Sequence, residues 1–197
     1  MSAVLTRPAV LSDAIVPSVA GREVLLVTTG ALLVALCAQI EIPLPFTPVP
    51  LSAQTFGVAL VGASLGSRRG ALSMGLYVLL GALGAPFYAG GGSGMHTLLG
   101  PTVGYLVGFV GMAALIGRLA ERRADRKPWT AFLAFQAGSL LLFACGVSGL
   151  MLTLDLPLRD ALAQGWLPFI PGDLLKTALA AGLVPATWRA VERVRRG

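Results

Sequence analysis

The sequence predicts an all-α integral membrane protein, a bundle of six transmembrane helices with the N- and C-termini in the cytoplasm. Three observations predict this class: an apolar composition, a series of helix-length apolar stretches, and an uneven distribution of basic residues. Of the 197 residues, 55% are hydrophobic and only 12% are charged, and the mean hydropathy is +0.79. Because about a quarter of the residues in a soluble domain are charged, the expected environment is the lipid bilayer.

The predicted helices follow from stretches that approach the roughly 20 apolar residues needed to span a bilayer. In chain order they are residues 24–40, 52–67, 70–85, 100–118, 130–153 and 169–188. Several are rich in glycine and alanine, as is typical of helices that pack closely in lipid. Only residues 66–70 separate the second and third stretches, so these two should form a tight helical hairpin. The alternative merges them into one re-entrant unit.

The distribution of basic residues favours six crossings. With a cytoplasmic N-terminus, thirteen of the 15 Lys and Arg residues fall on the inner side. These thirteen are Arg7, Arg22, Arg68, Arg69, Arg118, Arg122, Arg123, Arg126, Lys127, Arg189, Arg193, Arg195 and Arg196. Arg159 then lies outside and Lys176 within the membrane, an asymmetry that the positive-inside rule predicts for an even number of crossings. This topology accounts for the pI near 10.2, so no nucleic-acid partner is expected.

The chain is predicted to have three regions. Residues 1–22 form a cytosolic or interfacial arm, residues 23–190 the six-helix membrane domain, and residues 191–197 a basic cytosolic tail. The arm lacks the apolar region and small-residue cleavage site of a secretory signal peptide. We therefore expect one compact bundle in the membrane.

The last apolar stretch contains two ionisable side chains, Asp173 and Lys176. An ionised group in the bilayer costs about 2.5 kcal/mol or more on insertion scales, so such residues usually face a cavity, a protein interior or each other. Their i,i+3 spacing places both on one helix face, where they can neutralise each other or share a polar ligand. Pro171 and Asp173 suit the first turn of a helix, whose start faces outward in this topology. We expect a ligand site that opens to the outside; the alternative is a buried ion pair that locks this helix to a neighbour.

Two loops on the predicted outer side have unusual compositions. Residues 41–50 contain prolines at positions 43, 45, 48 and 50, which prevent a helix and enforce an extended backbone. Residues 86–94 combine two aromatic residues with a run of glycines, which adopt backbone angles closed to other residues. We expect the first loop to form a fixed wall of the site and the second a movable lid. Ordinary Pro- and Gly-rich turns are the alternative interpretation.

The sequence lacks motifs for catalysis, metals and cofactors. The glycine run does not have the GxGxxG spacing and no GxxxxGK(S/T) motif occurs, so any ATP must be hydrolysed by another chain. His96 is the only histidine and is expected to be a polar loop residue. An intramembrane enzyme that used Asp173 and Lys176 as acid and base would need a nucleophile or metal cluster that the sequence lacks. We therefore predict no catalytic residues, no metal, no cofactor and no enzymatic activity.

Three motifs follow one another along the chain: PFTPVPLSAQT at residues 45–55, GPTVGYLVGF at residues 100–109 and PGDLLK at residues 171–176. Together they closely resemble the BioY family, the biotin-binding S components of energy-coupling factor (ECF) vitamin transporters. The resemblance extends from about Ala31 to Lys176, which is nearly the whole membrane portion. It implies a six-helix bundle of the ECF S-component type, in the bacterial inner (plasma) membrane, with the vitamin held near the extracytoplasmic face.

The resemblance also implies which residues bind biotin. The acid and lysine of the family's GDxxK motif contact biotin and fall here on Asp173 and Lys176. The full set of candidates is Asp173, Lys176, Gln54, Phe87, Tyr88, Gly90, Gly91 and Tyr105. Val103 departs from the family, which commonly has Pro-Thr-Gly-Gly at this point, and it places a branched side chain near Tyr105. Biotin has two ureido N–H donors, a ureido carbonyl, an apolar bicycle and a carboxylate. We expect Lys176 to meet the carboxylate, and Asp173 to accept a ureido N–H or orient the lysine.

Partners are implied in the same way. In S components, an AxxxA pattern on the first helix docks the transmembrane coupling protein, which carries two ATPase subunits. Ala31 and Ala35 match this pattern, although small residues also serve ordinary packing within a bundle. The resemblance thus implies high-affinity biotin binding and uptake energised by ATPase partners. The alternative is a self-sufficient transporter of biotin or another small vitamin.

Overall fold

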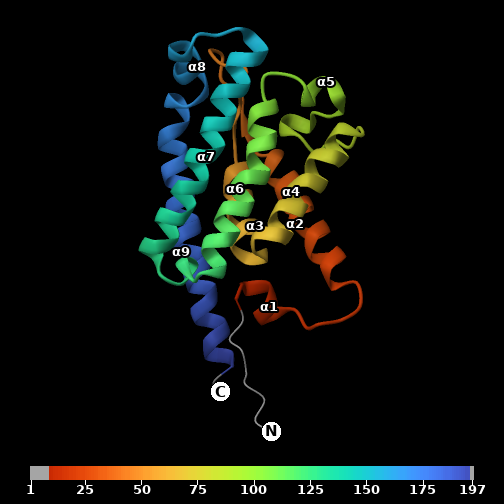
Figure 1. Ribbon diagram of the computed structural model, residues 1–197, viewed down its shortest axis with the longest axis vertical. Coiled ribbons are helices and arrows are strands. Elements are labelled where there is room, and N and C mark those ends of the chain that lie inside the picture. The colour runs from red at the N-terminus through yellow and green to blue at the C-terminus, as the bar shows by residue number, and fades with distance from the viewer. Residues whose placement is uncertain (1–8, 196–197) are drawn as a thin grey trace.

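The structure, a computed structural model, describes residues 9–195 as a helical bundle with one small two-stranded sheet (Figure 1). Its α-helices are α1 (Leu11–Ile15), α2 (Arg22–Ala38), α3 (Gln54–Leu65), α4 (Ser67–Ala82), α5 (Gly94–Leu98), α6 (Val103–Glu121), α7 (Pro128–Leu154), α8 (Leu158–Gly165) and α9 (Ile170–Val194). Its short elements are the strands β1 (Glu41–Ile42) and β2 (Leu51–Ser52) and the 3-10 turns η1 (Ala89–Gly91), η2 (Ala124–Arg126) and η3 (Leu167–Phe169). The predicted all-α class is confirmed.

Each of the six predicted apolar stretches overlaps one of the longer helices, namely α2, α3, α4, α6, α7 and α9. Three helical stretches of the described chain are long and apolar enough to cross a membrane: Val103–Glu121, Pro128–Leu154 and Leu158–Val194, the last of which joins α8 to α9. The helices α2, α3 and α4 have 17, 12 and 16 residues and are shorter than a standard span. The structure therefore has the helices of a membrane protein, and six crossings stay a prediction.

The hairpin between α3 and α4 is tighter than predicted. Instead of a five-residue turn at 66–70, Gly66 alone separates the two helices, and Arg68 and Arg69 belong to the first turn of α4. Gly66 has φ 87°, a backbone conformation that glycine adopts without steric cost. The backbone N–H of Ser67 donates to Glu121 Oε1 of α6 at 2.8 Å, which satisfies one of the free amides at the start of α4. The single-residue connection is thus stabilised by a neighbouring helix that the local sequence does not reveal.

Helix α6 lies in the middle of the bundle, in contact with α3, α4 and α7 (Figure 1). Its contact with α7 is close because glycines face each other there. A Cβ on Gly104 would overlap the backbone of Cys145, and a Cβ on Gly149 would overlap the backbone of Gly104. Small residues allow helices in lipid to approach in this way. This approach fixes the position of the neighbouring Tyr105, which contributes to the site described below.

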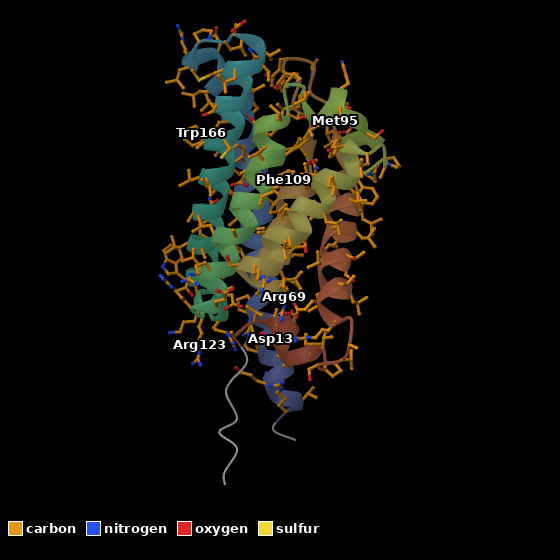
Figure 2. The ribbon with its side chains drawn as sticks, turned by 45° about the vertical axis from the view of Figure 1, so that its right-hand side comes forward. Asp13, Arg69, Met95, Phe109, Arg123 and Trp166 are labelled. Atoms are coloured by element: carbon orange, nitrogen blue, oxygen red, sulfur yellow. The ribbon has the colours of Figure 1, made fainter. Side chains whose placement is uncertain are left out.

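The two ends of the bundle carry different short elements. One end holds α5, α8 and the β1–β2 pair, and we call it the cavity end after the cavity described below (Figure 1). The other end holds α1, η2 and the last turns of α9, and we call it the basic end (Figure 1). Figure 2 places Met95 and Trp166 toward the cavity end, and Asp13, Arg69 and Arg123 toward the basic end. The labelled Arg69 and Arg123 thus lie at the end of the bundle opposite α5 and α8.

The N-terminal arm is attached to the bundle at the basic end. Within its described part, α1 buries Leu11 and Ser12, and Asp13 accepts from Arg22 and Arg69 at 2.8 Å each. Residues 1–8 of the predicted arm and residues 196–197 of the predicted tail lie outside the described residues. Helix α9 continues without interruption to Val194, across the predicted boundary at residue 190.

Candidate ligand-binding site

A cavity of about 360 Å³ lies at the cavity end of the bundle. Pockets for small molecules generally measure about 300–1,000 Å³, so this one suits a compact ligand. The residues that line it come from the loop before α3, from the first turn of α3, from the segment between α4 and α6, and from α6, α7, η3 and α9. They are Pro48, Val49, Pro50, Ser52, Gln54, Thr55, Tyr88, Ala89, His96, Thr97, Gly100, Pro101, Thr102, Tyr105, Leu106, Phe109, Leu142, Phe143, Phe169 and Lys176.

Aromatic rings form the apolar walls. Tyr105 and Phe143 meet edge to face with ring centroids 6.5 Å apart, and Phe143 lies 6.3 Å from Phe169. The Tyr105 hydroxyl donates to the carbonyl oxygen of Gly165 at 2.5 Å, so its polar atom is satisfied by the protein. A Cβ on Gly146 would overlap the Tyr105 ring, which places the ring directly against α7. Tyr105 therefore lines the cavity chiefly with an apolar surface, and its contact with biotin stays a prediction.

Lys176 supplies a positive charge to the cavity. Its Nζ donates to the backbone carbonyl of Ser52 at 2.9 Å, and among the residues that the structure describes it forms an ion pair with no carboxylate. No Asp or Glu is among the described residues that line the cavity. An ammonium has three donor hydrogens, so Lys176 can hold Ser52 and bind a ligand oxygen at the same time. This arrangement suits an anionic ligand.

Asp173 takes a different position from its neighbour. Helix α9 begins at Ile170, and Asp173 occupies its first turn, as predicted. The carboxylate is 6% exposed, accepts from Ser139 Oγ of α7 at 2.9 Å, and is absent from the cavity lining. The structure does not bring Asp173 and Lys176 together as an ion pair. One of the two charged groups therefore faces α7 and the other faces the cavity.

Gln54 is buried where α3 begins and lines the cavity. Its Oε1 accepts from Ser52 Oγ at 2.8 Å, and its Nε2 donates to the Tyr77 hydroxyl at 2.6 Å. Each of these amide atoms can take part in one further hydrogen bond. The side chain is thus held in one orientation with polar capacity left for a ligand.

The predicted lid contributes only one of its four candidates to the cavity lining. Tyr88 lines the cavity, whereas Phe87, Gly90 and Gly91 are not among the lining residues. Phe87 instead stacks on Tyr77 at 6.4 Å with an interplanar angle of 18°. Gly90 and Gly91 have φ of 61° and 75°, which strain other residues. These three residues shape the loop, and Tyr88 is the member that reaches the site.

The predicted docking residues face the interior of the chain. Ala31 is 1% exposed and Ala35 is 6% exposed, and both belong to the apolar core. Helix α2, which carries them, packs against α3 and α4. Their placement supports the alternative role of packing within the bundle, and partner docking through them stays a prediction.

Several lining residues were missed by sequence analysis. Phe109, Phe143 and Phe169 occupy apolar stretches whose composition does not distinguish a cavity wall from ordinary packing. His96, expected to be a polar loop residue, lines the cavity as well. Thr55 follows Gln54 directly, and its hydroxyl oxygen is buried without a hydrogen-bond partner in the described residues. For Thr55, its position next to the predicted Gln54 was the sequence feature that could have indicated a place in the cavity lining.

Short elements around the site were also missed. The two-residue pairing of β1 with β2, in which Glu41 lies opposite Ser52, closes the proline-rich loop into a hairpin. The 3-10 turn η1 lies within the predicted lid, α5 begins at its last residue, and α8 connects α7 to η3. Within residues 9–195, no three His, Cys, Asp or Glu side chains are grouped so that they could hold a metal ion.

The fold and the cavity define a helical membrane protein with a cavity of small-molecule size at one end of its bundle. The chain belongs to the BioY family, whose model matches residues 11–193. It is 37% identical over 159 residues to the biotin transporter BioY of Rhizobium etli, covering 77% of this chain and 84% of that protein. It is 40% identical over 168 residues to the biotin transporter BioY of Rhodobacter capsulatus, covering 80% of this chain and 87% of that protein.

A solved structure has the same fold. It is the S-component for biotin from an ECF-type ABC transporter, which matches with a TM-score of 0.76 at 24% sequence identity. The match covers 92% of this chain and 96% of that one. Nearly all of the described bundle therefore has the fold of that S-component.

Proposed function

We propose that this protein binds biotin and acts as the substrate-specific S component of an ECF-type biotin transporter. The names of its relatives and of its structural neighbour support this assignment. The observation that carries it is the cavity, which combines one lysine, aromatic walls and a buried glutamine with no lining carboxylate in the described residues. Biotin has a matching carboxylate, apolar bicycle and polar ureido group.

Each end of the ligand has a proposed partner. The Lys176 ammonium binds the biotin carboxylate while it keeps its hydrogen bond to Ser52, because the ammonium has more than one donor hydrogen. The aromatic walls formed by Tyr105, Phe143 and Phe169 contact the bicycle. Gln54 offers both a donor and an acceptor to the ureido group. Asp173 acts either as a further ureido acceptor, after a local rearrangement, or through its bond to Ser139, which holds this turn of α9.

Membrane topology and partners complete the proposal. All six longer helices cross the plasma membrane of a bacterial cell, with the basic end in the cytoplasm and the cavity open to the outside. Arginines at the basic end support this orientation: Arg69 and Arg123 are labelled there in Figure 2, and Arg22, Arg126 and Arg195 belong to or contact its short elements. A transmembrane coupling protein and two ATPase subunits energise uptake, since the described residues contain no nucleotide-binding motif of their own.

Binding to the purified protein tests the ligand assignment. Calorimetric titration with biotin, thiamin and riboflavin should give saturable binding for biotin alone. Biotin methyl ester, which lacks the negative charge, should bind at least tenfold more weakly, because Lys176 then faces a neutral group. Equal affinity for all three vitamins, or no binding of biotin, would contradict the proposal.

Uptake measurements test the requirement for partners. Cells that produce this chain with the coupling protein and ATPases should accumulate radiolabelled biotin, whereas cells that produce the chain alone should not. Equal uptake in both strains would instead establish the self-sufficient transporter.

A further inference from the structure

The segment 86–92 carries Tyr88 over the cavity and contacts α4 through Phe87, which stacks on Tyr77, and through Tyr88. The Tyr88 side chain is 2% exposed, and its hydroxyl donates to the carbonyl oxygen of Val78 at 2.7 Å. Its ring meets Tyr77 edge to face at 5.8 Å. Because the hydroxyl is bound to α4, Tyr88 contributes to the cavity as a fixed wall.

The Tyr88 ring fits against α4 because residue 81 is glycine. A Cβ at Gly81 would overlap several atoms of the Tyr88 ring, whereas a Cβ at Gly75, on the same helix, would have no atom within 4 Å. We call the space above Gly81 the Gly81 notch. Even one methyl group there would force the ring, or the segment that carries it, to move.

Two sets of polar contacts hold the backbone beside this ring. Gln39 Nε2, at the end of α2, donates to Ala35 O at 3.0 Å and lies 3.3 Å from Pro86 O and 3.5 Å from Tyr88 O. Within the segment, the Tyr88 N–H donates to Gly92 O at 3.0 Å and the Gly91 N–H donates to Tyr88 O at 3.1 Å. The segment is therefore a compact turn, fixed to the bundle at the Gly81 notch and at Gln39.

We propose that Gly81 is a positioning residue for ligand retention: its notch holds the Tyr88 ring, and the held ring keeps segment 86–92 closed over the cavity. Gly81 itself does not line the cavity, so it acts through Tyr88. The inference rests on the proposed function for its ligand, but the closed position of the segment is a property of the protein alone. The dissociation rate of a bound ligand then depends on whether the Tyr88 ring lies in the Gly81 notch.

Hydrogen exchange tests the closed position without any ligand. In purified Gly81→Ala, the amides of segment 86–92 should exchange about tenfold faster than in the wild type, because the displaced ring opens the turn. Gly75→Ala is the matched control on α4 and should leave this exchange unchanged. Unchanged exchange in Gly81→Ala would overturn the proposal, as would a loss of thermal stability accompanied by no local change at 86–92.

Dissociation kinetics test the effect on the ligand. Pre-bound radiolabelled biotin, chased with unlabelled biotin, should leave Gly81→Ala about tenfold faster than the wild type and leave Gly75→Ala at the wild-type rate. In a Tyr88→Leu background, Gly81→Ala should add no further acceleration, because the added methyl no longer meets a ring. Full additivity of the two substitutions would show that Gly81 acts by another route. Failure of the wild type to bind biotin would refute the proposed function, while the exchange measurement would still decide the role of the notch.

Discussion

Charged side chains at the two ends of the bundle differ in the partners that they have within the protein. At the basic end, Asp13 accepts from both Arg22 and Arg69, and buried Asp125 accepts from the indole of Trp188. At the cavity end, Lys176 donates to a neutral carbonyl and, within the described residues, has no carboxylate partner. A partly buried charge without an ion-pair partner is costly, and the proposed function assigns a ligand carboxylate to this place.

The comparison separates two uses of polar groups. Contacts at the basic end join segments that are distant in the chain: Arg126 lies over the Trp188 ring with its Cζ 3.2 Å from the ring centroid, and Arg195 donates to Ala14 O at 2.9 Å. At the cavity end, Lys176 and Gln54 line the cavity and can form further hydrogen bonds there. We therefore expect substitutions at the basic end to lower stability and substitutions at the cavity end to lower ligand affinity.

The largest effect is expected for Lys176→Met. Removing the cation should weaken biotin binding by about a hundredfold, because a buried carboxylate would lose its charged partner. Calorimetric titration of the purified variant measures this change. Lys127→Met, at the exposed position directly before α7, is the control and should bind as the wild type does. Wild-type affinity in Lys176→Met would remove the lysine from the site.

Trp188→Phe should affect stability and spare the ligand. The indole N–H donates to Asp125 Oδ2, and its loss leaves a buried carboxylate oxygen without this donor, at a cost of about 1–3 kcal/mol. Thermal unfolding in detergent should show a lower midpoint while biotin affinity is retained. Trp129→Phe is the control, because that indole is 70% exposed. A large loss of affinity in Trp188→Phe would mean that the two ends are not independent.

Ser139→Ala should have a smaller effect on affinity. The substitution removes the hydrogen bond to Asp173 Oδ1, and a net loss near 1 kcal/mol corresponds to about fivefold weaker biotin binding if this carboxylate supports the site. Ser148→Ala on the same helix is the control, since that exposed hydroxyl donates to the Ala144 carbonyl of its own helix. Unchanged affinity in Ser139→Ala would assign Asp173 to helix packing.

Asp13→Asn should have the smallest effect, and that effect should depend on pH. Partial burial would raise the pKa of Asp13, but hydrogen bonds from Arg69 and Arg22 outweigh it, and the pKa lies below its ordinary value of 3.8. A carboxyl with a lowered pKa in the folded state stabilises the fold above its unfolded pKa, and this contribution is lost as pH falls through the folded pKa. Unfolding midpoints of the variant and the wild type should therefore differ at pH 7 and converge at acidic pH. The exposed Asp160→Asn on α8 is the control, and a constant difference at every pH would exclude this origin.

Much of the helical framework could be predicted from local sequence. The apolar stretches located the longer helices because burial in lipid requires them, and Pro171 marked the first turn of α9 because its fixed φ suits that position. The single-residue connection at Gly66 and the small α5 and α8 helices could not be predicted, because the contacts that stabilise them come from distant segments. The Gly81 notch likewise depends on a ring that lies seven positions further along the chain.

The sequence by itself determined that this protein belongs in a lipid bilayer and where its longer helices lie. It also showed the pair of charged residues in the last helix. These features depend on composition and on the spacing of neighbouring residues. Only the tertiary structure decided that Lys176 faces the cavity while Asp173 bonds to Ser139. Residues three apart on a helix point about 60° away from each other at 3.6 residues per turn. Two charges on one broad face can thus meet different neighbours, and the packing of α7 and the β1–β2 hairpin against α9 makes that choice.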